Sequence, residues 1–115
     1  MGSVSSQENE AVGETRILLA DIETSFIQIK DLVIKSQSQD VYLLVERQFR
    51  LLKAHLLKLE IMVPQLDLVT HFTLTEVAKE IIVLVRGYLQ DDVKFTDTLT
   101  RLTQQMTRLK NDAKR

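Results

Sequence analysis

Two histidines, His55 and His71, carry the side chains in this sequence that are best suited to acid–base or metal chemistry. Neither lies in a His-Glu-x-x-His pattern or beside a second metal ligand at helical spacing. The sequence has no cysteine, so a disulfide, a thiolate metal site and a cysteine nucleophile are all excluded. It also contains no Gly-rich phosphate loop and no Gly-x-Ser-x-Gly elbow. We therefore expect that the chain is not an enzyme and that it requires no metal or cofactor.

The segment around His55 has the sequence Ala54-His55-Leu56-Leu57-Lys58, with a lysine three residues after the histidine. This segment resembles the phospho-acceptor stretch of histidine phosphotransfer domains, which are helical bundles of about this size. The resemblance implies a phosphorelay in which the His55 side chain receives the phosphoryl group. This function is one alternative.

A second resemblance rests on residues 56–60, LLKLE, and residues 85–89, VRGYL. The two segments are similar in spacing to the ends of the second and third helices of the BAG domain. That domain is a three-helix module that binds the nucleotide-binding domain of heat-shock chaperones. The resemblance implies a chaperone-binding domain, which is the other alternative.

The composition favours a helical protein. The chain has 115 residues, which is enough for one domain, and 44% of them are hydrophobic and 27% charged. Three glycines and one proline are too few for the turns of a β-sandwich. The formal net charge of −1 argues against nucleic acid as the main partner. These features predict an all-α fold, built as an antiparallel helical bundle.

The first fourteen residues are polar and show no hydrophobic periodicity, so we expect a disordered leader over residues 1–14. They do not form a signal peptide, and the chain has no apolar stretch long enough to span a membrane. Together with the absence of cysteine, this indicates a cytoplasmic or a nuclear protein. Gly2 and Ser6 match the spacing of a myristoylation signal. An ordinary chain terminus is the alternative.

Two helices are expected between Thr15 and Val63. In the first helix, which should end near Lys35, apolar residues recur at steps of three and four. These residues are Leu18, Ile22, Phe26, Ile29 and Val33. The second helix begins at Asp40 and carries a heptad pattern of Tyr42, Val45, Phe49, Leu52, Leu56, Leu59 and Val63. Pro64 should end it, because proline lacks the N–H that a helix interior needs.

A third helix should begin after an apolar connection over residues 65–72. Thr73 and Glu76 have the spacing of a capping box, and Phe72 and Val77 that of a hydrophobic staple. After this helix start, apolar residues recur at every seventh position as far as residue 109. They are Ile81, Tyr88, Phe95, Leu102 and Leu109. This spacing favours one long helix over residues 74–110. A turn near residues 90–93, at Asp91 and Asp92, is the alternative and would give four helices.

The domain is therefore expected over residues 15–111, with a basic tail over residues 112–115. A helix over 74–110 would be about 55 Å long, whereas the first two helices would be about 30 to 35 Å long. The overhang would expose an apolar stripe that needs a partner. The residues expected at this interface are Leu99, Leu102, Met106 and Leu109, with Arg101 and Arg108 beside them.

The sequence thus predicts a non-enzymatic module that binds another protein, or a second copy of itself, through helix packing. An adaptor or a subunit of a larger complex would fit this description. If the chain instead turns near residues 90–93, the same stripe completes a four-helix bundle. The argument for a partner at that stripe then no longer applies.

Overall fold

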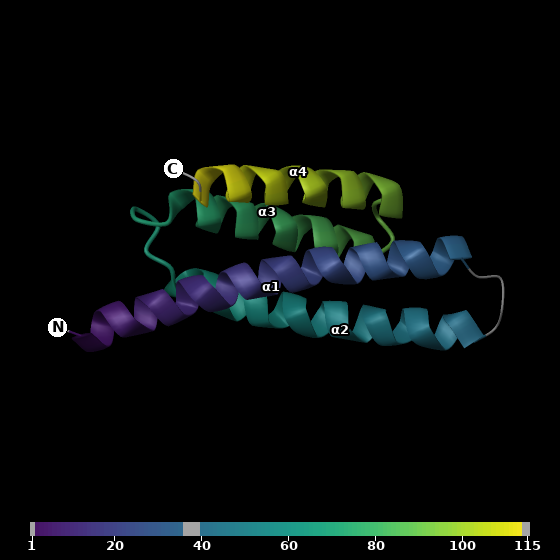
Figure 1. Ribbon diagram of the computed structural model, residues 1–115, viewed down its shortest axis with the longest axis horizontal. Coiled ribbons are helices and arrows are strands. Elements are labelled where there is room, and N and C mark those ends of the chain that lie inside the picture. The colour runs from purple at the N-terminus through teal and green to yellow at the C-terminus, as the bar shows by residue number, and fades with distance from the viewer. Residues whose placement is uncertain (1, 36–39, 114–115) are drawn as a thin grey trace.

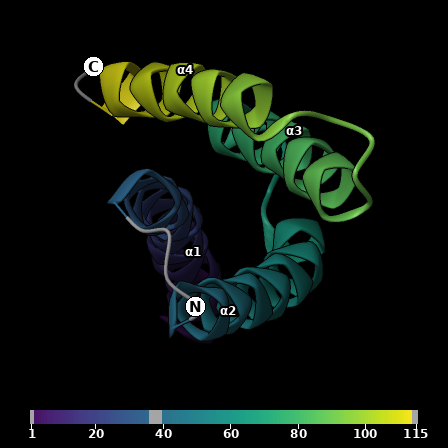
Figure 2. The ribbon, with the colours of Figure 1, turned by 90° about the vertical axis from the view of Figure 1, so that its right-hand side faces the viewer.

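The computed structural model describes residues 2–35 and 40–113, with side chains from residue 10 onward. It contains α1 (Gly2–Lys35), α2 (Asp40–Met62), α3 (Phe72–Leu89) and α4 (Phe95–Ala113), with a short 3-10 helix, η1 (Val63–Gln65), after α2. The helices alternate in direction and surround one core (Figures 1 and 2). The prediction of an all-α antiparallel helical bundle is confirmed, in its four-helix form.

Helix α1 begins at Gly2, well before the start that the sequence predicted at Thr15. Ala11 and Thr15 are both buried, and they extend the stripe of Leu18 and Ile22 backwards at the same steps of three and four. A small residue and a polar one do not stand out in a hydrophobic pattern. The leader expected over residues 1–14 is therefore helical from Gly2.

The α1–α2 hairpin supplies half of the core. Its fully buried side chains include Phe26 and Ile29 of α1 and Leu52 and Leu59 of α2. Helix α2 starts at Asp40 as predicted and passes into η1, whose first turn contains Pro64. The predicted boundaries of the second helix are thus correct to within a residue.

The connection before α3 is held by hydrogen bonds rather than by the predicted capping box. The Asp67 carboxylate accepts hydrogen bonds from the Thr70 hydroxyl at 2.8 Å and from the Val69 N–H at 3.1 Å, and these bonds lower the pKa of Asp67. Helix α3 starts at Phe72 with His71 at the N-cap, two residues before the Thr73 N-cap that the box requires. Its first turn has no side-chain cap, and the Thr75 hydroxyl donates back to the His71 carbonyl at 2.8 Å.

The prediction of one helix over residues 74–110 is wrong, because the chain reverses at Asp91. Asp91 has φ 61°, the left-handed conformation that ends many helices. The Asp92 N–H donates to the Gly87 carbonyl at 3.0 Å and the Asp91 N–H to the Tyr88 carbonyl at 3.1 Å. This is the bonding pattern of a Schellman motif, with aspartate at the position that glycine usually occupies. A Cβ on Gly87 would lie 3.1 Å from the Val93 side chain, so the returning chain packs closely over the helix end.

Helix α4 folds back along α3 and completes the core. An aromatic cluster lies where the two hairpins meet, with ring centroids 5.0 Å apart for Phe26 and Tyr88 and 5.7 Å apart both for Phe26 and Phe95 and for Phe49 and Tyr88. Such spacings favour edge and offset contacts between rings. Burial among these rings raises the pKa of Tyr88.

The left-handed turn generates a prediction about stability. Replacing Asp91 by valine should lower the free energy of unfolding by about 1 to 2 kcal/mol, because a β-branched residue tolerates positive φ poorly. Asp92 does not have a positive φ and is exposed, so Asp92→Val is the matched control and should have a much smaller effect. Urea unfolding followed by circular dichroism measures both. Equal losses for the two variants would contradict the turn.

Candidate partner surface

The residues that the sequence predicted for a partner interface lie in different places. Leu102, Met106 and Leu109 are buried in the core of the four-helix bundle, and Leu99 is partly buried against it. The overhang that motivated an interface there does not form, because the reversal at Asp91 returns α4 onto the bundle. The apolar stripe of α4 is covered by the chain itself.

The two arginines of that predicted interface are exposed on α4. The Arg108 guanidinium lies 4.0 Å from the Glu80 carboxylate of α3, and both side chains are well exposed to solvent. An exposed pair at this distance contributes little to stability. Because no exposed apolar stripe of the described chain lies beside them, Arg101 and Arg108 belong to an ordinary solvent-exposed helix face.

His55 lies on α2, and its ring is half-buried. Its Nδ1 atom is enclosed and has no hydrogen-bond partner among the described residues. Leu59, at the position where histidine phosphotransfer domains have glycine, is fully buried in the core. The phosphorelay through His55 therefore stays a prediction from the resemblance. No group of three metal-ligating side chains that could hold an ion occurs in the described part of the chain.

The two segments that resemble the BAG domain lie next to each other. Arg86 of α3 forms an ion pair with Glu60 of α2, so residues 56–60 and 85–89 are neighbours. The described chain has four helices where that resemblance implies three.

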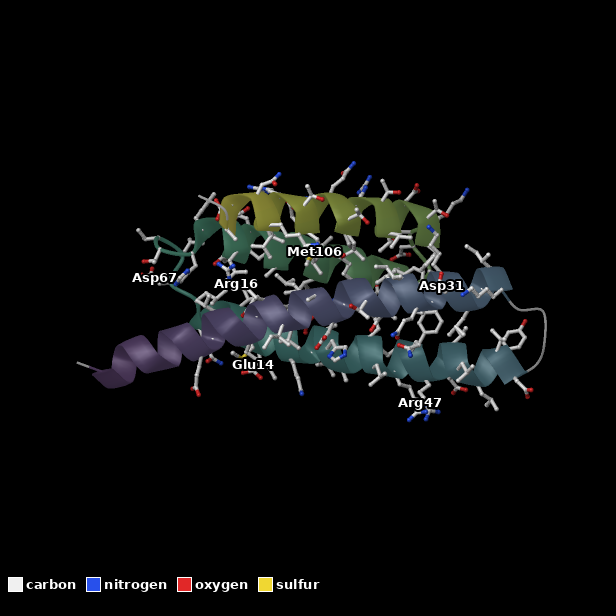
Figure 3. The ribbon with its side chains drawn as sticks, viewed as in Figure 1. Glu14, Arg16, Asp31, Arg47, Asp67 and Met106 are labelled. Atoms are coloured by element: carbon white, nitrogen blue, oxygen red, sulfur yellow. The ribbon has the colours of Figure 1, made fainter. Side chains whose placement is uncertain are left out.

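The outer side of α2 carries a second heptad seam, which the sequence analysis missed. Its members follow one another at steps of four and three, and all of them are exposed. They are Leu43, Arg47, Arg50, Ala54, Leu57 and Ile61. Leu57 is 60% exposed and Ile61 65% exposed, although each is a large apolar side chain on a stable helix. Leu44 and Leu51 lie beside the seam and are also exposed. Figure 3 shows Arg47 projecting from α2 away from the other three helices.

Helix α1 lies beside α2 and contributes the rest of this surface. Ile17 is 61% exposed, and Thr24 and Asp31 follow it at intervals of seven residues on the same side of the helix. Asp21 and Gln28 lie between them on that side. We call the combined surface the α1–α2 outer face, defined by Ile17, Asp21, Thr24, Gln28 and Asp31 from α1 and by the α2 seam with Leu44, Leu51 and Lys58.

The linked ends of α1 and α2 extend beyond α3 and α4 (Figure 1). Val33 and Tyr42, which the sequence predicted as core positions, are exposed there. Ile34 and Leu43 are exposed as well. An apolar overhang therefore exists, but it belongs to the α1–α2 hairpin and not to α4.

The outer side of α4 has a different character. Its exposed threonines at positions 100, 103 and 107 donate to carbonyls one turn back at 2.9 Å. Gln104 and Arg101 lie beside them, and no large apolar residue of α4 is among the strongly exposed ones. Helix α4 is thus apolar on one side only, as expected of a helix that faces water, whereas α2 is apolar on two sides.

The chain matches no protein-family model, no curated protein and no solved structure. None of the helices in the described part combines the length and the apolar character needed to cross a membrane. The function must therefore be argued from the α1–α2 outer face itself.

Adjacent leucines on α2 provide a test of this surface. Leu56→Ala should lower the free energy of unfolding by about 2 to 5 kcal/mol, because Leu56 is only 6% exposed. Leu57→Ala should change it by less than about 0.5 kcal/mol, because that side chain already lies in water. Both substitutions introduce alanine into the same helix, so helix propensity cancels in the comparison. Urea unfolding at low protein concentration measures the difference, and similar losses for both variants would contradict the assigned faces.

Proposed function

We propose that this chain is a non-enzymatic protein–protein interaction module, an adaptor or a subunit of a complex, that docks through its α1–α2 outer face. The observation that carries the proposal is the exposed heptad seam along α2. A helix that is apolar on two sides is normally buried on both. In this chain only one of the two sides of α2 is covered.

The spacing of the seam supports a helical partner. The steps of four and three along the whole seam, from Leu43 to Ile61, are those that let one helix pack along another. Fully burying one leucine or isoleucine contributes about 1.5 to 3 kcal/mol, so a few such residues supply a useful share of a binding free energy. The entropy lost on association offsets part of this gain.

The charges of the seam support a specific rather than a general apolar contact. Arg47 and Arg50 lie within the seam and Lys58 beside it, and all three are exposed. Arginine is common at protein interfaces, and charges at the edge of an apolar seam fix the register of the partner.

The absence of cysteine is consistent with action in the cytoplasm or the nucleus.

Site-specific photo-crosslinking in cells tests this function. The photoreactive amino acid benzoyl-phenylalanine is placed at Ala54, in the middle of the α2 seam, and in a control at Gln104, on the outer side of α4. Both positions are exposed, so neither change should disturb the core. We expect covalent adducts with a defined protein at position 54, identified by mass spectrometry, and few or none at position 104.

Two results would contradict the proposal. The first is the absence of any protein adduct at position 54 above the level at position 104. The second is the same set of adducts at both positions, which would indicate random encounters rather than a docking face.

A further inference from the structure

The two helices of the α1–α2 outer face carry opposite charges. Helix α1 contributes the carboxylates of Asp21 and Asp31 to this face, and α2 contributes the cationic groups of Arg47, Arg50 and Lys58. Arg50 is paired with Glu46 on its own helix. Within the described part of the chain, no ion pair involves the other four side chains. The face therefore offers two complementary charged strips, separated by the width of a helix, and neither strip is neutralised by the other.

The heights of these residues along the bundle match in pairs. A shallow groove between the two helices is lined by Gln28, Asp31 and Leu32 of α1 and by Leu44 and Gln48 of α2. Asp31 and Arg47 are thus at nearly the same height. Because the helices are antiparallel with the same rise per residue, seven residues back along α1 and seven forward along α2 cover the same distance. The further pairs at equal height are Thr24 with Ala54, and Ile17 with Ile61.

We propose that the partner bound to the α1–α2 outer face is a second copy of this chain, an inference that rests on the proposed function. The two copies are related by a two-fold axis parallel to the helices, and α1 of each copy lies antiparallel on α2 of the other. Such an axis preserves height along the bundle, so each residue of α1 meets the residue of α2 at its own level in the second copy. Asp31 then faces Arg47, Asp21 approaches Lys58, and Ile17 packs on Ile61.

Charge selects this arrangement over the other two-fold one. A two-fold axis perpendicular to the helices would place α1 on α1 and α2 on α2. The carboxylates of Asp21 and Asp31 would then face carboxylates, and Arg47 and Lys58 would face cations. Like charges brought together at an interface are strongly unfavourable, whereas complementary strips attract.

The size of the face is also suitable for a stable dimer. Residues 14–35 of α1 run beside residues 43–62 of α2 and residues 63–65 of η1 for about 33 Å. Two neighbouring helices cover a width of about 20 Å, because each is about 10 Å across. The resulting area of roughly 700 Å² per copy is close to the roughly 800 Å² per partner of a standard stable interface.

Mixing two charge-reversal variants tests the arrangement. In Asp31→Arg homodimers, arginine would face Arg47 twice, and in Arg47→Asp homodimers, aspartate would face Asp31 twice. Each variant alone should dimerise at least about tenfold more weakly than the wild type, measured by sedimentation equilibrium. An equimolar mixture of the two should form heterodimers, seen by native mass spectrometry, because both contacts of the mixed pair are then complementary.

The controls separate folding from association. Circular dichroism should show unchanged helicity, because both positions are exposed. If one variant loses helicity, the pair Asp21→Lys and Lys58→Asp provides the same test about three helical turns away. Arg101→Asp on α4 is the matched charge reversal off the face and should leave dimerisation unchanged.

Two outcomes would overturn the second-copy proposal. One is a wild-type chain that remains monomeric at all concentrations measured. The other is a wild-type dimer that both reversals leave intact, with no preference for heterodimers on mixing. If the chain is monomeric and Ala54 still crosslinks to a different protein in cells, the docking function stands and only the identity of the occupant is wrong. If position 54 forms no adduct either, the docking function fails as well.

Discussion

The left-handed turn at Asp91 decides which apolar residues of this chain remain exposed. Two backbone hydrogen bonds, from Asp91 to Tyr88 and from Asp92 to Gly87, end α3 and turn the chain back. Because α4 then lies along α3, Leu102 and Met106 enter the core. Without this reversal the same residues would form an uncovered stripe. With it, the exposed apolar seam that remains lies on the opposite side of the molecule, on α2 beside α1.

The contrast between α2 and α4 shows why the exposed apolar surface on α1 and α2 needs an explanation. Single exposed apolar residues are normal on any protein, and Val83 on α3 is one of them. On α2, however, Leu57 and Ile61 belong to a seam with heptad spacing on the side opposite the core. Helix α4 has no such second seam, although it belongs to the same bundle. Ordinary core packing explains the buried stripe of every helix, but it leaves the outer seam of α2 without a role.

The sequence predicted the helical class, the boundaries of α2 and most of the buried stripe positions, because hydrophobic spacing directly reflects which side of a helix is buried. It gave the turn at Asp91 only as the alternative to one long helix, because glycine and proline usually mark a reversal and aspartate supplies the left-handed residue here. It missed the start of α1, because Ala11 and Thr15 are core residues that carry a weak hydrophobic signal. The outer seam of α2 was visible as leucines off the main stripe, at Leu43 and Leu57. The position of this seam relative to α1 depends on how the helices pack together, which the hydrophobic pattern of a single helix does not show.

Hydroxyl-radical footprinting of the chain in its native assembly tests the central claim most directly, because side-chain oxidation reports solvent access residue by residue. The chain is isolated from cells under mild conditions, and its labelling is compared with that of the dilute purified chain. The account predicts that Leu57 and Ile61 are strongly protected in the assembly, while the exposed Val83 on α3 is labelled equally in both samples. Equal labelling of Leu57 and Ile61 in the two samples would contradict the account, because the α1–α2 outer face would then be an ordinary solvent-exposed surface.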